Sequence, residues 1–264
     1  GTWGGRTSWG AAQHGEIYDI AQWYPRMCVF DDLRGWDTLP YIGSEFYLEY
    51  GHFDYSVTVP WNFLVAGTGQ LMNPTEVLTR TQLARLEQAR HSDKTILIRT
   101  PEETTDPASR PKQSGTLTWR FHMDHTRDVV FSASPTFVWD AARINLPRDP
   151  HDTPPNSLPA TTIPLAMSVY PVESVGADGW SRSTEYLKDA VEDFSRRWFP
   201  YPYPTAVNVA GFSTGMEYPG LAFDGINDKT KQLFWVTAHE IGHTWFPMIV
   251  GSNERRWAFM DEGF

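Results

Sequence analysis

The residues with the clearest chemistry lie near the C-terminal end of the sequence, in the segment His-Glu-Ile-Gly-His at residues 239–243. Residues four positions apart share one face of a helix, so His239 and His243 can bind the same metal ion while Glu240 projects beside them. Glu262 follows after 18 intervening residues and can provide a third ligand from a second helix. Two imidazoles and one carboxylate, with the fourth position open, are typical of a catalytic zinc site. The spacing therefore predicts one bound Zn²⁺ ion.

The same pattern predicts metal-assisted hydrolysis. Zinc lowers the pKa of a water molecule in the open position to about 7, and Glu240 is placed to accept the proton that this water loses. A chance grouping on an amphipathic helix is the competing interpretation. We disfavour it because histidine and glutamate on the inward stripe of a helix, beside Leu233 and Val236, are costly to bury without a partner.

Two further motifs accompany the metal-binding pattern. Gly-Met-Glu stands upstream of it at residues 215–217, and Asp-Glu-Gly-Phe stands at residues 261–264. With these motifs, residues 201–264 resemble the M1 family of zinc aminopeptidases, the gluzincins. The resemblance is fainter in the first part of the sequence, where Gln-Trp-Tyr-Pro-Arg at residues 22–26 and the strand-like residues 53–60 look like the N-terminal β domain of that family.

The resemblance implies a role for each residue of the two motifs. His239, His243 and Glu262 would bind zinc, and Glu240 would be the general base. Glu217 would hold the free α-amino group of the substrate. The implied activity is that of an aminopeptidase, which hydrolyses N-terminal peptide bonds of peptides with a free N-terminus.

Other residues would assist at the substrate end of the site. Gly215 and Met216 would bind the substrate beside Glu217, and Gln22 is a candidate for contact with its amine. The sequence departs from the family at two places in this motif. The family pattern Gly-x-Met-Glu-Asn reads Thr-Gly-Met-Glu-Tyr here, so Thr214 and Tyr218 replace the first Gly and the last Asn.

The expected fold class is α+β. We expect an N-terminal antiparallel, saddle-like β domain over residues 1–174, followed by a truncated thermolysin-like α/β zinc peptidase domain over residues 175–264. The family places a tyrosine that stabilises the transition state well beyond the third zinc ligand and follows it with a helical domain. The sequence ends two residues after Glu262. We therefore expect a part of a longer enzyme, whose activity these residues need not have by themselves.

Periodicity supports this division. Short β-branched or aromatic runs predict antiparallel strands at residues 53–59, 95–99, 116–122, 129–133 and 137–141. A capping box of Thr79 and Gln82 begins a helix that reaches residue 90. In the second part we predict strands at 165–170, 205–210 and 221–223, and helices at 183–198 and 229–246. Asn227 or Asp228 is the expected cap of the last helix.

Composition excludes some classes of function. The 264 residues carry 32 acidic and 22 basic side chains, a formal net charge of −10. Nucleic-acid binding needs a basic face, so we expect no nucleic-acid partner. No run of 18 apolar residues is present, and we expect no transmembrane segment. The family resemblance suggests a secreted or periplasmic protein.

Several alternatives stay open at this point. An endopeptidase or an epoxide hydrolase could use the same zinc, and a homologue or fragment without catalysis could act as a binding module. His122 and His125 could form a second metal pair. In a regular strand, however, their side chains would point to opposite faces, which favours a structural role.

Overall fold

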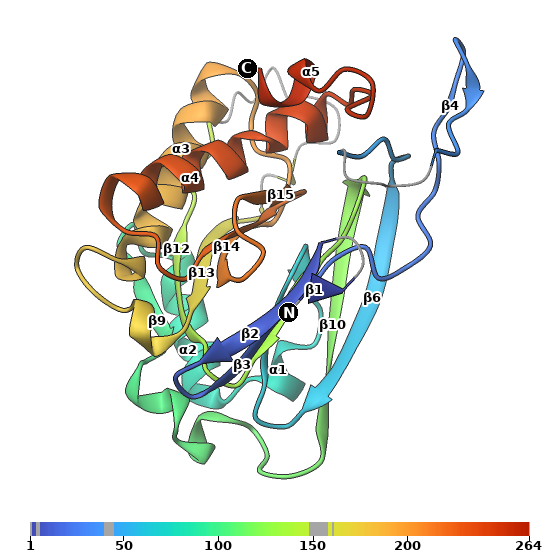
Figure 1. The fold of residues 1–264 in the computed structure, drawn as a ribbon. Helices are drawn as coiled ribbons and strands as arrows, with labels where there is room; N and C mark the ends of the chain where they lie inside the picture. The colour runs from blue at the N-terminus through green and yellow to red at the C-terminus, as the bar shows by residue number, and fades with distance from the viewer. Residues whose placement is uncertain (1, 4–5, 40–44, 148–157, 160, 264) are drawn as a thin grey trace.

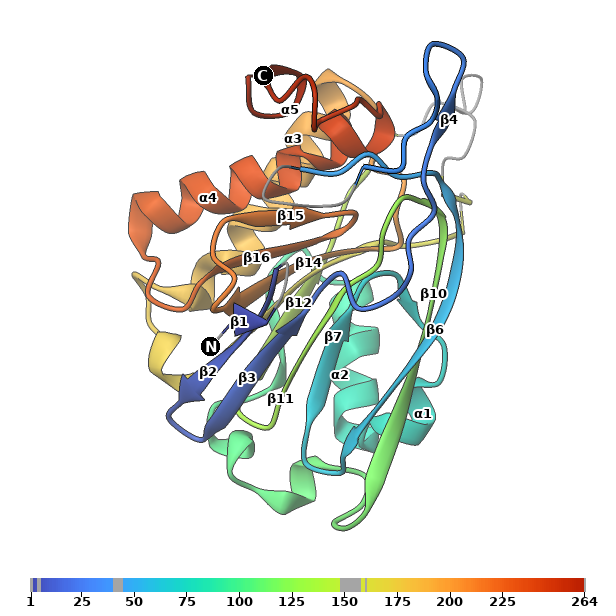
Figure 2. The ribbon, with the colours of Figure 1, turned by 45° about the vertical axis from the view of Figure 1, so that its right-hand side comes forward.

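The structure is a computed structural model that describes residues 2–3, 6–39, 45–147, 158–159 and 161–263. Phe264, the last residue of the C-terminal motif, lies outside the described residues. Within the described residues, the strands form sheets of five, three and six strands and one two-stranded ribbon. Figures 1 and 2 show these sheets with helices α3 and α4 on one side of the molecule.

The first two sheets are antiparallel. The five-stranded sheet has the order β1 (Thr2–Trp3), β2 (Thr7–Ala12), β3 (Gly15–Ile20), β11 (Phe131–Ser134) and β7 (Leu64–Gly67). The three-stranded sheet has the order β6 (Gly51–Pro60), β10 (Thr116–Thr126) and β8 (Gln70–Leu71). The ribbon consists of β4 (Phe30–Asp31) and β5 (Gly35–Trp36).

The six-stranded sheet is mixed. Its order is β15 (Met216–Tyr218), β16 (Leu221–Gly225), β14 (Thr205–Gly211), β13 (Leu165–Tyr170), β12 (Val138–Arg143) and β9 (Ile96–Arg99). The pairs β13–β14 and β14–β16 are parallel, and the other pairs are antiparallel. Helix α3 (Ser183–Arg197) connects β13 to β14, as a parallel pair requires a crossover connection. Helix α4 (Thr230–Gly242) follows β16.

The remaining helical segments are short, apart from α2 (Arg80–Arg90). Within the described residues they are α1 (Pro74–Val77), α5 (Phe259–Glu262), four 3₁₀ turns at Glu102–Thr104, Pro107–Ser109, Val172–Ser174 and Trp180–Arg182, and one π-helical turn at Thr244–Ile249. Among the described residues, no helix combines the length and the apolar character that crossing a membrane requires.

The two faces of the six-stranded sheet bury different clusters. Trp139, Val169 and Val207 belong to a large core that also contains Val65 of β7, Phe121 of β10 and side chains of α2. Strand alternation sends neighbouring residues such as Ala166 and Ala206 to the opposite face, where they pack against α3. The antiparallel sheets and α2 therefore cover one face, and α3 and α4 cover the other.

Most predicted elements are confirmed. The strand predictions correspond to β6, β9, β10, β11, β12, β13, β14 and β16. The capping box is present, because Thr79 Oγ1 accepts a hydrogen bond from the Gln82 amide and the Gln82 side chain accepts one from the Thr79 amide. The predicted domain boundary at residue 174 falls between β13 and α3, yet β9, β12 and β13 share one sheet with β14, β15 and β16. The division into domains at that residue stays a prediction.

Asp19 joins the five-stranded sheet to the segment that leads to Gly215. Its buried carboxylate accepts hydrogen bonds from the backbone amides of Phe212 at 2.8 Å and Ser213 at 3.2 Å. Two serine hydroxyls complete the set, Ser132 at 2.9 Å and Ser8 at 3.3 Å. Asp19, with these four donors, is the main polar connection between β3 and this segment. It therefore fixes the position of the chain that leads to Gly215.

We expect Asp19→Ala to lower the free energy of unfolding by about 3 kcal/mol or more, because it leaves buried donors without an acceptor. Urea unfolding followed by circular dichroism measures the change. Asp32→Ala serves as the matched control, since Asp32 is exposed, and it should change the stability by less than about 0.5 kcal/mol. Equal stability of the two variants would contradict this role of Asp19.

Candidate metal centre

Helix α4 is fixed to the sheet by a buried stripe. Leu233 is fully buried and Val236 nearly so. Beside them, the Thr237 hydroxyl donates to Asp224 Oδ2 of β16 at 3.2 Å and accepts from Asn208 Nδ2 of β14 at 2.9 Å. These contacts set the rotation of the helix about its axis, and with it the direction in which residues 239–243 point.

The ends of α4 differ from the prediction. The helix begins at Thr230 with Lys229 as its cap and without a side-chain capping bond, while Asp228 instead accepts a hydrogen bond from the Gly225 amide. It ends at Gly242, four residues earlier than predicted. After His243 the chain continues as a π-helical turn over Thr244–Ile249. Within this turn Phe246 has an extended conformation, as the residue before a proline usually does.

The structure brings the three predicted metal ligands together. His239 Nε2 lies 3.3 Å from His243 Nε2 and 3.3 Å from Glu262 Oε2. The third side of the triangle, from His243 Nε2 to Glu262 Oε2, is 3.8 Å. Ligands at 2.0 to 2.1 Å in a tetrahedron are separated by about 3.3 Å. The donor set and the spacing therefore fit zinc, with Glu262 supplied by α5 as the sequence predicts.

Asp261 is a member of the site that the sequence analysis missed. His243 Nδ1 lies 3.0 Å from the Phe246 carbonyl oxygen and 3.0 Å from Asp261 Oδ1. Burial lowers the pKa of His243, but the hydrogen bond and charge of Asp261, together with the charges of Glu240 and Glu262, raise this pKa to about 9. A general rule could have indicated it: the second ring nitrogen of a metal-binding histidine needs a hydrogen-bond partner, often a carboxylate.

Glu240 is buried beside the imidazoles, with Oε1 3.9 Å from His239 Nε2. Burial and the negative charges of Glu217 and Asp224 raise its pKa to about 9. On the other side, Gly215 comes so close that a Cβ there would stand 3.5 Å from Glu240 Oε1, and it has a positive φ of 61°. The backbone that precedes Glu217 therefore forms one wall of the space around Glu240.

Glu217 lies at the centre of a group of carboxylates. Oxygen atoms of Glu45, Glu217 and Glu254 are within 4.8 Å of one another, and Glu217 is equally close to His243 and Asp261. Burial, followed by the charges of Glu45 and Asp261, raises the pKa of Glu217 well above its usual value. Its Oε1 is buried and accepts no hydrogen bond from any described residue. This part of the site is short of positive charge.

Arginine neutralises only part of this group. Arg127 Nη1 pairs with Glu254 Oε1 at 2.8 Å, and Arg6 pairs with Glu45 and also contacts the sulfur of Met216. Burial still raises the pKa of Glu254 to about 8 in spite of Arg127. A bound cation would therefore be favoured near Glu217.

Two other predicted positions have distinct surroundings. Gln22 has a positive φ of 55°, and its Nε2 is buried without a hydrogen-bond partner among the described residues. Tyr218, which replaces the family asparagine, is buried and its ring stacks on Phe46 with centroids 6.0 Å apart. The larger side chain at 218 thus packs into the core beside the site.

The argument about His122 and His125 assumed a regular strand, and the strand is irregular between these two residues. A β-bulge between Met123 and Thr126 interrupts the register with β6, and His125 has a positive φ of 50°. A bulge redirects one side chain, and here the His125 ring contacts the His52 ring, with centroids 4.8 Å apart. His122 instead lies between two aspartates, 2.8 Å from Asp54 and 3.1 Å from Asp124. Both of its nitrogens are engaged, which fits the structural role.

Of the comparisons with known proteins, only the comparison with solved structures gives matches. No protein-family model matches the sequence, and no curated protein matches it. Among solved structures, a mutant of the M1 zinc metallopeptidase from Deinococcus radiodurans has a TM-score of 0.50 at 14% sequence identity. The match covers 82% of this chain and 39% of the other.

This chain has the fold of an M1 zinc metallopeptidase. Two further structures support the same match with the same TM-score, identity and coverage. One is the Deinococcus radiodurans mutant bound to a Tyr-Ser-Ala substrate, and the other is a two-domain M1 zinc metallopeptidase mutant bound to L-tryptophan. The chain spans 39% of the length of these structures. At this identity the likeness concerns the fold, and the residue roles rest on the site itself.

We expect the protein to bind one zinc ion and Asp261→Ala to weaken its zinc affinity about 10- to 100-fold, since the partner of His243 is lost. Competition with a chromogenic chelator measures the affinity. Asp193→Ala, which removes an aspartate of α3 that pairs with Arg197, should leave the affinity unchanged. An Asp261→Ala variant that is folded and binds zinc as tightly as the unmodified protein would show that Asp261 does not support the ligand.

Proposed function

We propose that this protein is a zinc metallopeptidase that hydrolyses the N-terminal peptide bond of its substrates. The observation that carries the proposal is the triangle of His239 Nε2, His243 Nε2 and Glu262 Oε2, with sides of 3.3, 3.3 and 3.8 Å. A catalytic zinc site needs three such ligands and an open fourth position. Glu262 leaves that position accessible, because its side chain is 53% exposed.

Bound zinc would supply a water nucleophile of low pKa and polarise the scissile carbonyl. The protein supplies the proton transfer. Glu240 is buried next to the ligands and fixed by α4, so its carboxylate can take a proton from the attacking water and pass it to the leaving amine.

Selectivity for the first peptide bond would come from Glu217. The α-ammonium of a peptide is a cation, and Glu217 offers a buried carboxylate oxygen that no described residue pairs with. Glu45 and Glu254 increase the negative potential at the same place. A substrate whose ammonium is held there can present only its first peptide bond to the metal ligands, as long as Glu217 and the ligands keep their positions.

In this proposal the six-stranded sheet and α4 form a thermolysin-like catalytic part, and the antiparallel sheets form a saddle-like part. Gly215 and Met216 would contact the substrate at the start of β15, which is the edge strand of the six-stranded sheet. An extended peptide can pair with such an edge. A tripeptide such as Tyr-Ser-Ala, the substrate held by one structure of similar fold, is the natural test substrate.

We expect Glu240→Gln to retain zinc and to lose about 100-fold or more of the peptide turnover, because the amide keeps the shape and cannot accept a proton. Zinc content by atomic absorption and release of the N-terminal residue are measured on the same sample. Glu87→Gln, an exposed change on α2, is the control and should affect neither. Turnover near normal in Glu240→Gln would assign the base to another residue.

We expect N-terminal acetylation of a tripeptide to cost about 1.5 to 3 kcal/mol of transition-state binding, because it removes the charge that pairs with Glu217. Values of kcat/KM for the free and the acetylated peptide measure this difference. In Glu217→Ala both peptides should be slow and the difference should largely disappear. Equal rates for the two peptides with the unmodified protein would rule out the aminopeptidase and leave an endopeptidase. Bound zinc without turnover of either peptide would favour a binding module.

A further inference from the structure

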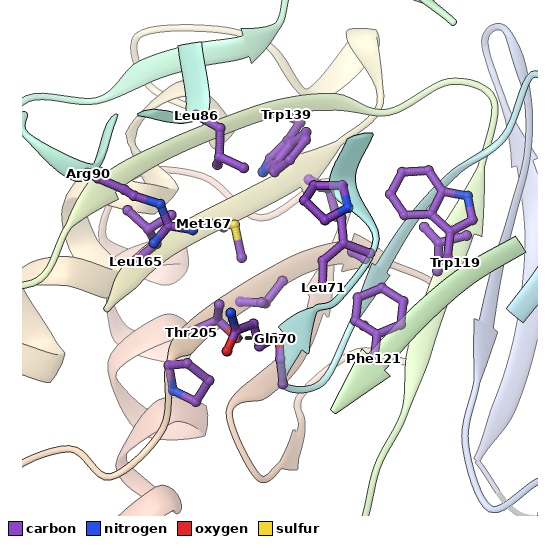
Figure 3. A pocket seen from close by; sticks show the side chains of 18 of the residues that line it. Gln70, Leu71, Leu86, Arg90, Trp119, Phe121, Trp139, Leu165, Met167 and Thr205 are labelled. Carbon is purple, nitrogen blue, oxygen red and sulfur yellow. Dashed lines mark hydrogen bonds between the residues drawn. The ribbon is translucent and has the colours of Figure 1, made fainter. Parts of the chain in front are cut away.

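A second cavity lies away from the metal centre, between the antiparallel strands and the six-stranded sheet. Its volume is about 320 Å³. Strands β7, β8 and β10 line one side, strands β12, β13 and β14 line the other, and the last turns of α2 close it from above in Figure 3. None of the metal-site residues lines it. It therefore lies on the face of the six-stranded sheet opposite to α4.

The wall of this cavity is mainly apolar. Trp119 and Phe121 project from β10, Trp139 from β12, Met167 from β13 and Leu86 from α2. Pockets for small molecules typically have volumes of about 300 to 1,000 Å³ and combine apolar walls with a few polar groups. At about 30 Å³ for each water-sized group, the cavity accommodates about ten non-hydrogen atoms.

Arg90 gives the cavity its charge. Among the described residues that line it, Arg90 is the one ionised side chain and no carboxylate is present. Figure 3 shows Arg90 reaching from α2 toward Leu165 and Met167. Its Nη1 donates to the Ile163 carbonyl at 3.3 Å, and its Nε is 3.8 Å from Glu87. A guanidinium has five N–H donors, so these two contacts leave donors for an anion.

Trp139 adds aromatic surface. The residue is only 6% exposed and lines the cavity opposite β7 and β10, so its ring is available for packing against an apolar ligand.

We propose that this cavity binds a small amphiphilic carboxylate, with an apolar body of about ten non-hydrogen atoms against Trp139 and Met167 and its carboxylate on Arg90. A medium-chain fatty acid has this chemistry. The proposal is independent of the peptidase function, because none of the lining residues takes part in the metal centre.

Titration calorimetry with decanoate tests the proposal, with decanol as the uncharged probe of similar length and both below the concentrations at which they aggregate. We expect saturable binding of one decanoate per chain. Arg90→Gln should weaken decanoate binding about tenfold, the lower end for a charge-assisted hydrogen bond because Arg90 is 37% exposed. The same variant should bind decanol as the unmodified protein does.

Control variants distinguish binding inside the cavity from binding at the protein surface. Arg80→Gln removes an exposed arginine of the same helix outside the cavity and should leave decanoate binding unchanged. Ala66→Phe and Leu86→Phe place a ring in the cavity and should weaken both probes at least tenfold, with circular dichroism confirming the fold. Either of the two filled variants suffices if the other does not fold.

The proposal is overturned by any of three results. The first is the absence of saturable decanoate binding. The second is unchanged binding of decanoate in a folded, filled variant, which would place the ligand elsewhere. The third is an equal loss for decanoate and decanol in Arg90→Gln, which would mean that Arg90 acts through the local structure and not through its charge.

Discussion

The site depends on one electrostatic constraint, the crowding of buried carboxyl groups at the C-terminal end of α4. Glu217, Glu240, Glu254 and Asp261 are all nearly inaccessible to solvent. Arg127 pairs with Glu254 and His243 with Asp261, while Glu217 has no cationic partner among the described residues. Burying unpaired carboxylates is costly, so the arrangement favours ligands that bring positive charge. A divalent metal ion and a substrate ammonium are two such ligands.

The architecture holds this charge in place from several directions. Helix α4 contributes His239 and Glu240, and His243 follows directly after its last residue, while β15 contributes Glu217 from the edge of the six-stranded sheet. Thr237 ties the helix to β14 and β16, and Asp19 ties the segment before Gly215 to the five-stranded sheet. Both sheets therefore position the site, although the metal ligands themselves come from α4 and α5.

The same sheet packing produces the cavity beneath α2. The wide Trp139 and Trp119 rings meet smaller residues such as Ala66 and Gly67 where two sheets approach. Large interiors with aromatic walls are expected in a sequence with 12 tryptophans. Arg90 is the one ionised side chain among the described residues of this mainly apolar wall, and this is what distinguishes the cavity from a packing defect.

The sequence by itself determined which residues form the candidate metal centre, because an i, i+4 histidine pair on an amphipathic helix depends only on helix geometry, and Glu262 follows in a recognisable motif. It also determined most strands and the capping box at Thr79, which are local properties. It did not determine the end of α4 at Gly242 or the bulge that redirects His125.

Only the tertiary structure decided which carboxylates meet. Glu45 and Glu217 are far apart in the sequence, and nothing local indicates that Glu254 and Asp261 join them. The hydrogen bond from the Phe212 amide to Asp19 and the cavity beneath α2 were also decided only by the tertiary structure. Contacts of this kind arise from the packing of whole sheets against each other, which depends on the summed shape of many side chains and has no signature at any single position.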